Sequence, residues 1–322
     1  MEDKNISNII NQVILIDNNL NAKIILKVLK DIENSILINY EKFREANKID
    51  LKNHNGFPLD KNIITNIFKN LQKENIIYGK VITSSKDETK IYGKEYLNRG
   101  NVLIFNEGNF YCLLEIFLKN FLVGNTSIIV SNGYMYGSNN LLVTIIKEVL
   151  KSNDLSPDYL NLFVTDDSSK VLEEYANIDL NIVIGPRDYQ RSIIEKSKVP
   201  VLTSGYLNYD IYIDEIINAE FIKKILSLGL NLTIYLKEDI NMDIDAIKVS
   251  GLEEVIKMIN YNGSLYASSI FTSDSKKASQ FIRNVKSKMI SVNASPNIEE
   301  LMDIKVSDLS LEKTICYPRY SN

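Results

Sequence analysis

The sequence is poor in the residues that build the common catalytic and metal sites. It contains two cysteines, Cys112 and Cys316, and one histidine, His54, in 322 residues. A single histidine excludes His-rich zinc sites and any Ser-His-Asp triad built on another histidine, so we expect no metal site. His54 lies in a polar loop, where we expect no chemistry. Two isolated thiols exclude a disulfide scaffold and predict a reduced, cytoplasmic protein.

Long hydrophobic runs and an excess of one charge are also missing. The longest apolar runs, such as Asn101–Phe105, have the length of a strand, far short of the roughly 20 residues that a membrane span needs. The first residues lack the pattern of a signal peptide. A net charge of −4 gives no basic face for nucleic acid. We therefore expect neither a membrane nor a nucleic-acid partner.

What the sequence does contain is typical of a folded globular chain. Hydrophobic residues make up 45%, and the small net charge excludes general disorder, while only 13 glycines and 6 prolines exclude a collagen-like chain. At roughly 100–200 residues per domain, the length predicts two domains.

The first hundred residues favour helices. Apolar residues at helical spacing predict two amphipathic helices within residues 5–45 and a further helix over Asp60–Gln72. The following segment around Ser84–Lys94 is charged, and we predict a loop there.

From residue 99 onward, short apolar runs alternate with helical patterns. The alternation predicts a parallel sheet with helices on both faces, which is a Rossmann-type, doubly wound α/β fold. The expected strands of this part are Asn101–Phe105, Ser127–Ser131, Asn161–Thr165, Asn181–Ile184 and Val199–Leu202. A second, smaller α/β unit follows, with expected strands Ile211–Ile213, Leu232–Leu236, Ser268–Phe271 and Met289–Val292.

The same pattern predicts the domain organisation. We expect N-terminal helices and a cofactor-type domain over residues 1–205, and a shorter α/β domain over 206–295. A tail over 296–322 carries a last predicted strand at Thr314–Tyr317.

Gly185-Pro186-Arg187 is the first candidate binding motif. It follows an apolar strand and opens a helix, so the backbone amides and the helix dipole would favour a phosphate, with Arg187 adding charge. The alternative is a plain strand-to-helix turn, because the sequence has neither a G-x-G-x-x-G run nor a Walker lysine there.

A second candidate lies between the strand ending at Ser131 and the next helix. Gly133 and Gly137 fall at the carboxyl end of a predicted parallel strand, where ligands bind in open α/β sheets. Ser138 is alternatively the N-cap of the helix.

The thiols and the acidic pairs suggest no further site. Cys112 lies in an apolar helix, where a cysteine is usually a small core residue, and Cys316 is treated in the same way. Acidic pairs such as Asp214-Glu215 have no His or Cys partner in sequence, and we expect them on solvated ends.

Taken in order, several short segments resemble the aldehyde dehydrogenase superfamily, and within it the γ-glutamyl phosphate reductase (glutamate-5-semialdehyde dehydrogenase) branch. The matching segments are Ala46–Leu51, Gly100–Ile104, Asn109-Phe110, Gly124–Ile129, Ser138-Asn139, Pro186-Arg187, Lys198–Val201, Tyr212–Asp214, Gly263-Ser264, Thr272–Asp274 and Val292–Ser295. Their order along the chain implies an aldehyde-dehydrogenase-like fold.

The resemblance also implies a cofactor and an assembly. In that family the cofactor is NADP, and the residues matching its cleft are Ser131, Gly133, Ser138, Gly185, Pro186 and Arg187. The C-terminal strand of the family crosses to a neighbouring subunit, so the resemblance implies a homodimer through Thr314–Tyr317.

The departures from the family bear on its chemistry. The family uses a cysteine nucleophile in a C-N-x-x-E element, and the nearest counterpart here begins at Ile217, so we assign no catalytic residue. Asp188 replaces a glycine at a helix start, where its charge would disfavour a phosphate. NADP therefore stays possible as a cofactor from the resemblance, while Asp188 argues against its binding.

Three functions stay open at this stage. The first is a pseudoenzyme that keeps the fold for binding or assembly. The second is an NADP-dependent glutamate-5-semialdehyde dehydrogenase of proline biosynthesis, with altered catalysis. The third is a nucleotide-binding sensor that keeps the cofactor cleft without chemistry.

Overall fold

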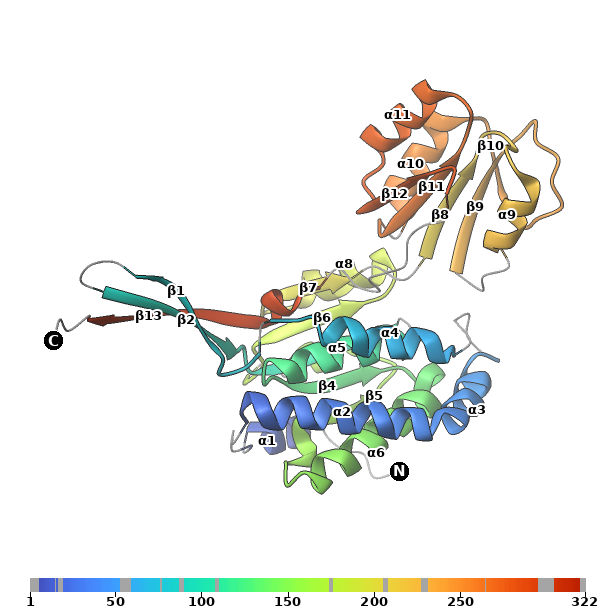
Figure 1. The fold of residues 1–322 in the computed structure, drawn as a ribbon. Coiled ribbons are helices and arrows are strands. Elements are labelled where there is room, and N and C mark those ends of the chain that lie inside the picture. Colours follow the sequence, from blue (N-terminus) through green and yellow to red (C-terminus); the bar gives the residue numbers. More distant parts are fainter. Residues whose placement is uncertain are drawn as a thin grey trace. The chain divides into compact units, whose positions relative to one another are not determined.

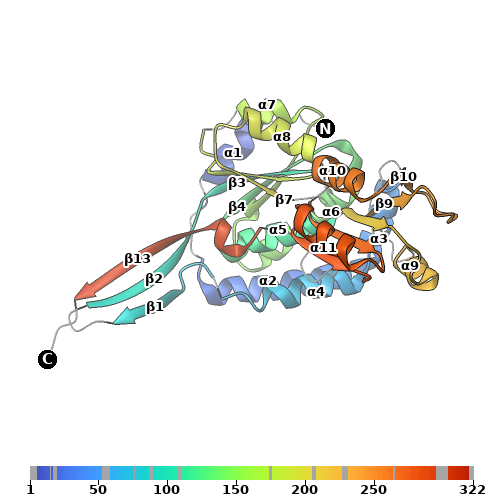
Figure 2. The ribbon, with the colours of Figure 1, turned by 90° about the horizontal axis from the view of Figure 1, so that it is seen from above.

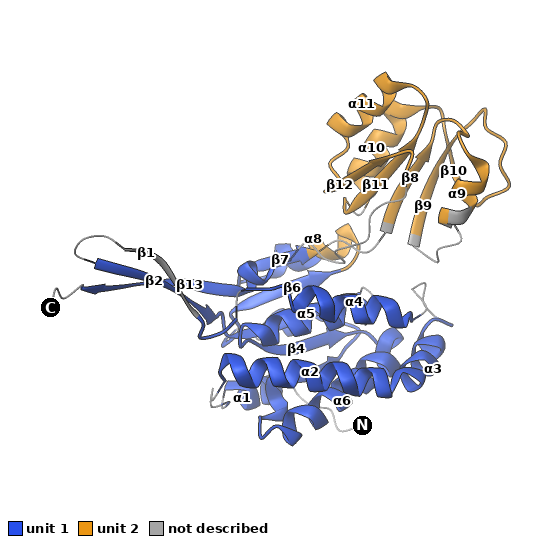
Figure 3. Ribbon diagram, in the orientation of Figure 1, with its two compact units in different colours: residues 1–184, 192–203, 304–322 blue, residues 185–191, 204–303 orange. Residues whose placement is uncertain are grey.

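The chain folds into two compact units, which Figure 3 distinguishes by colour. The computed structural model describes residues 6–14, 16, 20–52, 59–75, 77–86, 90–107, 110–173, 176–204, 208–226, 231–263, 265–294 and 304–318. Unit 1 comprises residues 1–184, 192–203 and 304–322, and unit 2 comprises residues 185–191 and 204–303. His54 lies outside the described residues.

Unit 1 begins with four helices, α1 (Ile6–Ile14), α2 (Ala22–Ile38), α3 (Tyr40–Asp50) and α4 (Lys61–Leu71). The sequence predicts two helices before residue 45, whereas the structure has three. The additional boundary falls at Asn39, whose backbone and side-chain amides both donate to the Ser35 carbonyl, at 3.1 and 2.9 Å. These bonds end α2, and α3 starts at the next residue.

The sheet of unit 1 confirms the predicted alternation of strands and helices (Figure 1). Its strand order is β5-β4-β3-β6-β7, and the pairs β3–β4, β4–β5 and β3–β6 are parallel. The chain first adds β4 and β5 on one side of β3 and then adds β6 and β7 on its other side, as in a doubly wound sheet. The elements are β3 (Asn101–Asn106), α5 (Phe110–Leu122), β4 (Thr126–Ser131), η1 (Gly133–Met135), α6 (Tyr136–Ser152), η2 (Pro157–Tyr159), β5 (Leu160–Val164), α7 (Ser168–Glu173), β6 (Leu180–Ile184), α8 (Arg187–Lys196) and β7 (Val201–Ser204).

Helix α5 lies at the centre of unit 1. Every residue of Phe110–Leu122 except Lys119 is buried, because the helix packs on β4 and is covered by α2 and α4. A helix that is buried on nearly all sides needs packing partners on each side. Cys112 is one of these buried residues, 1% exposed, as expected for a core cysteine.

A second, three-stranded sheet extends from unit 1 as an arm (Figures 1 and 2). It consists of β1 (Val81–Lys86), β2 (Lys90–Asn98) and β13 (Ser310–Pro318), in the order β1-β2-β13. The prediction of a charged loop around Ser84–Lys94 is therefore wrong. Strand β2 pairs antiparallel with β1 on one side and with β13 on the other, from Asn98↔Ser310 to Lys90↔Pro318. The expected strand Thr314–Tyr317 lies inside β13.

Just before β13, backbone carbonyls of the C-terminal segment accept hydrogen bonds from side chains of the earlier part of unit 1. Arg99 Nε donates to the carbonyl of Asp308 at 2.7 Å, and Asn125 Nδ2 donates to that of Leu309 at 2.8 Å. Lys119 Nζ donates to the carbonyl of Ile304 at 2.9 Å. These bonds hold the short helix η3 (Val306–Leu309) against unit 1 after the chain has passed through unit 2.

Unit 2 contains a parallel five-stranded sheet with the order β10-β9-β8-β11-β12. Its elements are β8 (Asn208–Ile213), α9 (Ala219–Leu226), β9 (Asn231–Lys237), β10 (Ile247–Val249), α10 (Leu252–Asn262), β11 (Ala267–Phe271), α11 (Ser275–Asn284) and β12 (Met289–Val292). The four predicted strands are confirmed. β10 is additional, because three residues give too short a pattern to recognise.

The two faces of this sheet carry separate apolar clusters. Ile211 and Ile213 of β8 pack with Ile222 and Ile225 of α9. Tyr212, which points to the other face, packs in a cluster that includes residues of α10 and α11. Unit 2 is therefore covered by helices on both sides, and its chain order reverses between β8 and β11.

Candidate functional site

The first predicted binding segment follows β4 in unit 1. Ser131 is 2% exposed, and its Oγ accepts a hydrogen bond from Asn139 Nδ2 at 2.9 Å and donates to the Asn132 carbonyl at 3.0 Å. Gly133 is exposed at the start of η1, and a Cβ there would meet no atom within 4 Å. The structure thus places Gly133 at the surface and turns the polar atoms of Ser131 toward the protein.

The start of α6 is bound by a carboxylate of the protein itself. Asp50, the last residue of α3, accepts hydrogen bonds from the backbone amides of Gly137 and Ser138 at 3.1 and 2.8 Å, and from Ser138 Oγ at 2.5 Å. Asp50 is 6% exposed and Ser138 is fully buried. The backbone amide and the hydroxyl of Ser138 already donate to Asp50 within unit 1. A bound phosphate would have to displace Asp50 to reach these two groups.

Gly137 is required for this contact. A Cβ on Gly137 would lie 2.9 Å from Asp50 Oδ1, closer than a carbon and an oxygen tolerate. Asp50 belongs to the A-N-x-x-D segment, but only the fold shows that this carboxylate meets α6. The sequence alone does not reveal this contact, because Asp50 and Gly137 are 87 positions apart.

The second predicted segment follows β6. Gly185 is buried, and its carbonyl accepts a hydrogen bond from Gln190 Nε2 at 3.0 Å. Pro186 is exposed. Arg187 Nη1 donates to the carbonyl of Asn260, near the end of α10, at 2.6 Å, where the helix dipole favours a cation. Part of the guanidinium is therefore used within unit 2.

The residues at these two helix starts do not fit the phosphates of a dinucleotide. At α6 the amides already bind a carboxylate. At α8 the carboxylate of Asp188, which is 97% exposed, lies 3.6 Å from Arg191 Nη1. The first turn of α8 therefore carries a negative charge. Ser131, Gly133, Ser138, Gly185, Pro186 and Arg187 stay a prediction as cofactor residues.

Neither cysteine lies in unit 2. Cys112 is in the core of unit 1, and Cys316 is exposed on β13. The sequence has no cysteine between these two positions. Ile217, the nearest counterpart of the family's cysteine, lies two residues before α9 and is 44% exposed.

Unit 2 contains a polar cluster around Asp214, a residue expected on a solvated end. Asp214 is instead 7% exposed, at the carboxyl end of β8. It accepts hydrogen bonds from Tyr212 Oη at 2.9 Å, Thr272 Oγ1 at 3.0 Å and Lys277 Nζ at 2.7 and 2.9 Å. The expectation was wrong because Lys277 and Thr272 are distant in sequence, and only the parallel pairing of β8 and β11 brings them to Asp214.

These contacts set the ionisation of the cluster. Burial raises the pKa of Asp214, but the hydrogen bonds from Lys277, Tyr212 and Thr272 outweigh it and hold the pKa below its ordinary value. Burial and the bond to Asp214 raise the pKa of the Tyr212 hydroxyl, which stays protonated. Glu215 accepts bonds from the amide and hydroxyl of Ser273, which lower the pKa of its carboxyl.

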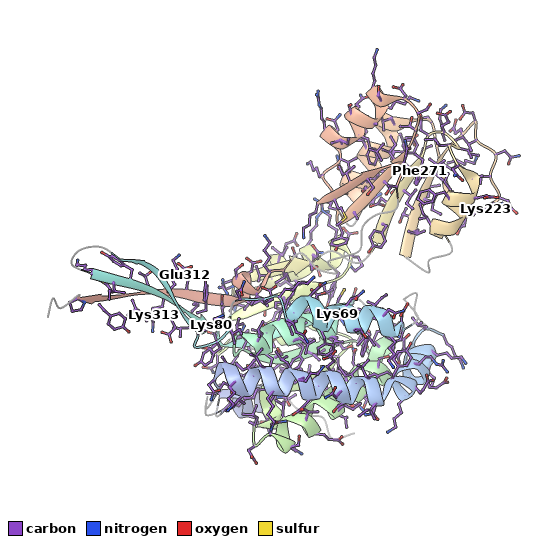
Figure 4. All side chains as sticks on the ribbon, in the orientation of Figure 1. Lys69, Lys80, Lys223, Phe271, Glu312 and Lys313 are labelled. Atoms are coloured by element: carbon purple, nitrogen blue, oxygen red, sulfur yellow. The ribbon has the colours of Figure 1, made fainter. Side chains whose placement is uncertain are left out.

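The cluster forms one wall of a pocket of about 480 Å³. The lining residues are Asp214, Glu215, Ile216, Lys237, Asp239, Ile240, Asn241, Asp274 and Lys277. They come from the segments that follow β8 and β9, from the end of β9, and from the start of α11. Phe271, labelled in Figure 4, is the last residue of β11 and so marks the carboxyl end of that strand.

Within the described residues, two common features are absent. No group of three or more His, Cys, Asp or Glu side chains is arranged to hold a metal ion. No helix is both long and apolar enough to cross a membrane.

Comparison with known proteins gives no matching family model. Among curated proteins, a γ-glutamyl phosphate reductase of Dictyoglomus turgidum is 24% identical over 217 residues, covering 62% of this chain and 52% of the reductase. A γ-glutamyl phosphate reductase of Lachnospira eligens is 21% identical over 347 residues, covering 85% of this chain and 83% of the reductase. The Dictyoglomus match thus spans about half the length of that relative.

Solved structures show the same arrangement of elements over nearly the whole chain. A glyceraldehyde-3-phosphate dehydrogenase of Methanocaldococcus jannaschii, complexed with NADP, matches with a TM-score of 0.71 at 14% identity and covers 99% of this chain and 95% of its own. The chain has the aldehyde dehydrogenase fold.

Two further structures agree with this fold. Aldehyde dehydrogenase 21 of Physcomitrella patens gives a TM-score of 0.72 at 13% identity, over 99% of this chain and 91% of its own. The γ-glutamyl phosphate reductase of Thermotoga maritima gives 0.60 at 17% identity, over 98% of this chain and 97% of its own. The predicted aldehyde-dehydrogenase-like α/β fold and the resemblance to γ-glutamyl phosphate reductases are both confirmed.

Proposed function

We propose that this aldehyde-dehydrogenase-fold protein is a binding or assembly protein that does not carry out cysteine-dependent reduction. The position of its thiols carries the proposal. Hydride-transferring chemistry through a thiohemiacetal needs an accessible thiolate at the substrate. Cys112 is 1% exposed within α5, Cys316 lies on the arm, and unit 2 has no cysteine.

An activity assay tests this proposal directly. Purified protein is incubated with NADP, glutamate-5-semialdehyde and phosphate, and NADPH is followed by absorbance, with the Lachnospira eligens reductase as positive control. We expect no turnover above the blank. Turnover that iodoacetamide or Cys316→Ala abolishes would show a thiol-dependent reductase, and turnover that survives both would show an enzyme of another mechanism. Either result overturns the proposal.

Nucleotide binding is a separate question. The M. jannaschii neighbour is complexed with NADP, but Asp50 and Asp188 place negative charge at both helix starts, so we propose that NADP binding is lost. Calorimetry with NADP and NAD at millimolar concentration is expected to give no heat of binding. A saturable isotherm would instead favour the nucleotide-binding sensor, and it would leave the absence of turnover unaffected.

An apolar stripe on the arm supports the assembly role. Leu311, Ile315 and Tyr317 lie on one face of β13, which they share with Lys313, and Leu311 and Tyr317 are 47% and 54% exposed. Their register partners on β2 include Leu97 and Ile91, which extend the stripe across the strand pair. We propose a homodimer through this arm, because β13 is an edge strand of its sheet and an edge strand can pair with a second copy.

The dimer is tested by light scattering after size exclusion. Figure 4 labels Glu312 and Lys313 on β13, and Glu312 alternates with the stripe residues and points to the opposite face. Leu311→Lys combined with Tyr317→Lys is expected to give a monomer, whereas Glu312→Gln leaves a dimer. A wild-type protein that is monomeric at 100 micromolar, roughly the upper range of weak dimer affinities, contradicts the proposed assembly.

A further inference from the structure

The turn between β4 and α6 contains an asparagine followed by a glycine, Asn132-Gly133. Such a pair can cyclise, because the backbone nitrogen of the glycine can attack the side-chain carbonyl carbon of the asparagine. Glycine favours this attack, since it has no Cβ to hinder the approach and its backbone bends freely. Asparagine is accordingly one of the thermolabile residues of proteins. The chain has three Asn-Gly pairs, and the structure around each pair determines how fast it reacts.

The Asn132-Gly133 pair lies at the surface, with the attacking nitrogen accessible. Gly133 is exposed and is the first residue of η1. The first amides of a helix have no acceptor within that helix. Among the described residues, no backbone carbonyl accepts a hydrogen bond from the Gly133 amide. The nitrogen therefore does not have to leave such a bond before it reacts.

The side chain of Asn132 is held beside the glycine that follows it. Its Oδ1 accepts a hydrogen bond from the Tyr134 amide at 3.2 Å. Because Gly133 is the residue between them, the ring closed by this bond contains both Asn132 Cγ and the Gly133 nitrogen. The bond also withdraws electron density from the carbonyl, which makes Cγ a better electrophile. A Cβ on Gly133 would meet no atom within 4 Å, so a cyclic product has room to form.

The Asn262-Gly263 pair has the opposite surroundings. Asn262 is the last residue of α10, and Gly263 is buried. The Gly263 amide donates to the Ile259 carbonyl at 2.8 Å, so its nitrogen can attack only after the end of the helix has opened. A Cβ on Gly263 would lie 2.5 Å from that carbonyl oxygen, so the site is also tightly packed. The remaining pair, Asn55-Gly56, lies outside the described residues.

We propose that Asn132-Gly133 is a site of spontaneous covalent modification, at which the chain deamidates through a succinimide. A bond forms between the Gly133 nitrogen and Asn132 Cγ, and the bond from Cγ to Nδ2 breaks. Nδ2 leaves as ammonia, with the proton that the Gly133 amide has lost. Water then adds to one of the two ring carbonyls and opens the ring. Opening at one carbonyl gives aspartate, and opening at the other gives isoaspartate, whose backbone runs through the former side chain.

Both products change the turn between β4 and α6. Each replaces a neutral amide by a carboxylate, so a negative charge is added beside Gly133. Aspartate keeps an oxygen that can accept from the Tyr134 amide, as N-cap residues do. Isoaspartate adds a methylene carbon to the backbone, which lengthens the turn and displaces η1. The reaction uses neither a thiol nor a cofactor, so it is independent of the proposed function.

Ageing of the full chain at mildly alkaline pH, followed by peptide mass spectrometry with separation of the isomers, tests the site. We expect both aspartate and isoaspartate at residue 132, formed faster as the pH rises because the attacking nitrogen must lose its proton. In the folded protein, residue 262 should deamidate at least about tenfold more slowly, because its helix end must open first. In urea the two residues should react at similar rates, since neither is then held by the fold.

Gly133→Ala is the matched variant. The added Cβ meets no atom within 4 Å and Gly133 does not have a left-handed φ, so the fold is expected to persist, which circular dichroism checks. The methyl group hinders the attack and should slow deamidation at residue 132 by about tenfold, without effect at residue 262. No modification at residue 132, aspartate without isoaspartate, equal rates at residues 132 and 262 in the folded protein, or an unchanged rate in Gly133→Ala overturns the proposal.

Discussion

Two buried aspartates, Asp50 and Asp214, organise the polar interior of the two units. Each accepts hydrogen bonds from groups far away in sequence, and each is less than a tenth exposed. Composition could not reveal them, because the chain has 41 acidic residues and most such residues lie on the surface. What distinguishes these two is the set of donors that the fold brings to them.

Asp214→Asn is expected to destabilise unit 2. The change removes the ion pair with Lys277, whose side chain is 36% exposed and so keeps part of its hydration. The free energy of unfolding should fall by about 2 kcal/mol, less than for a fully buried pair. Urea denaturation measures the change. Asp239→Asn, which breaks an exposed pair with Lys237, should cost less than about 1 kcal/mol. Equal losses in the free energy of unfolding would contradict the larger effect expected for Asp214→Asn.

The same residue gives a pH dependence with a defined sign. The pKa of Asp214 is lowered in the folded protein from 3.8, so its ionised form stabilises the fold above that value. This contribution is lost as the pH falls from 3.8 through the lower folded value. Thermal melts between roughly pH 2 and 4, on the acid side of an ordinary aspartate, should show a shallower loss of stability in Asp214→Asn than in wild type. An identical dependence of the melting temperature on pH in the two proteins would contradict this role of the Asp214 carboxylate.

Asp50 and Gly137 form a testable pair in unit 1. Asp50→Ala leaves the amides at the start of α6 without their acceptor and should cost about 2 kcal/mol. Gly137→Ala places a methyl group 2.9 Å from Asp50 Oδ1, so it should destabilise wild type but much less the Asp50→Ala protein. A double-mutant cycle by urea denaturation measures the coupling, and additive effects would contradict the contact.

At the scale of elements, the sequence predicts strands and helices that depend on nearby residues, and it fails for those that depend on distant ones. The alternating strands and helices after residue 99 were predicted because each short apolar run is a buried strand, fully buried in the case of β4. The hairpin β1–β2 was missed because half of its pairing comes from β13, more than two hundred residues later. Charged residues such as Lys94 and Glu95 are found both in loops and in strands that have solvent on both faces, so they do not distinguish the two.

Asn125 links the C-terminal segment to unit 1, and its loss should loosen that segment. Its Oδ1 accepts the amides of Arg99 and Gly100, and its Nδ2 donates to the Leu309 carbonyl. Asn125→Ala removes the partner of the buried Leu309 carbonyl and of the two half-buried amides. Hydrogen exchange should increase over residues 304–318 and stay unchanged in β9. Asn132→Ala, which removes only the cap of η1, is the control. Unchanged exchange near η3 would contradict this role.

At the scale of the whole molecule, the chain repeats one strand order in two sheets. In both, the first three strands run outward and the fourth returns to the other side of the first. Each unit has its own apolar core, and separate cores predict separate unfolding transitions. The sequence indicated two α/β parts, but not that the chain returns to unit 1 at residue 304, because that return depends on side-chain contacts to backbone carbonyls.

Core truncations should therefore act on one transition at a time. Leu114→Ala in α5 and Ile270→Ala in β11 each remove a fully buried side chain, at a cost of about 2–5 kcal/mol. Calorimetry should show each variant shifting a different melting transition. A single transition that moves by the same amount in both variants would contradict two separately melting cores.

The pairing of β2 with β13 has a consequence for synthesis of the chain. Asn98 ends β2 and Ser310 begins β13, so the ribosome must add the intervening two hundred or so residues before the arm can close. At about 5–20 residues per second, one side of β2 stays unpaired for roughly ten to forty seconds. A nascent or truncated chain that stops before Ser310 would present that open strand edge to other chains, and aggregation of such fragments would be a direct result of the order in which the strands are made.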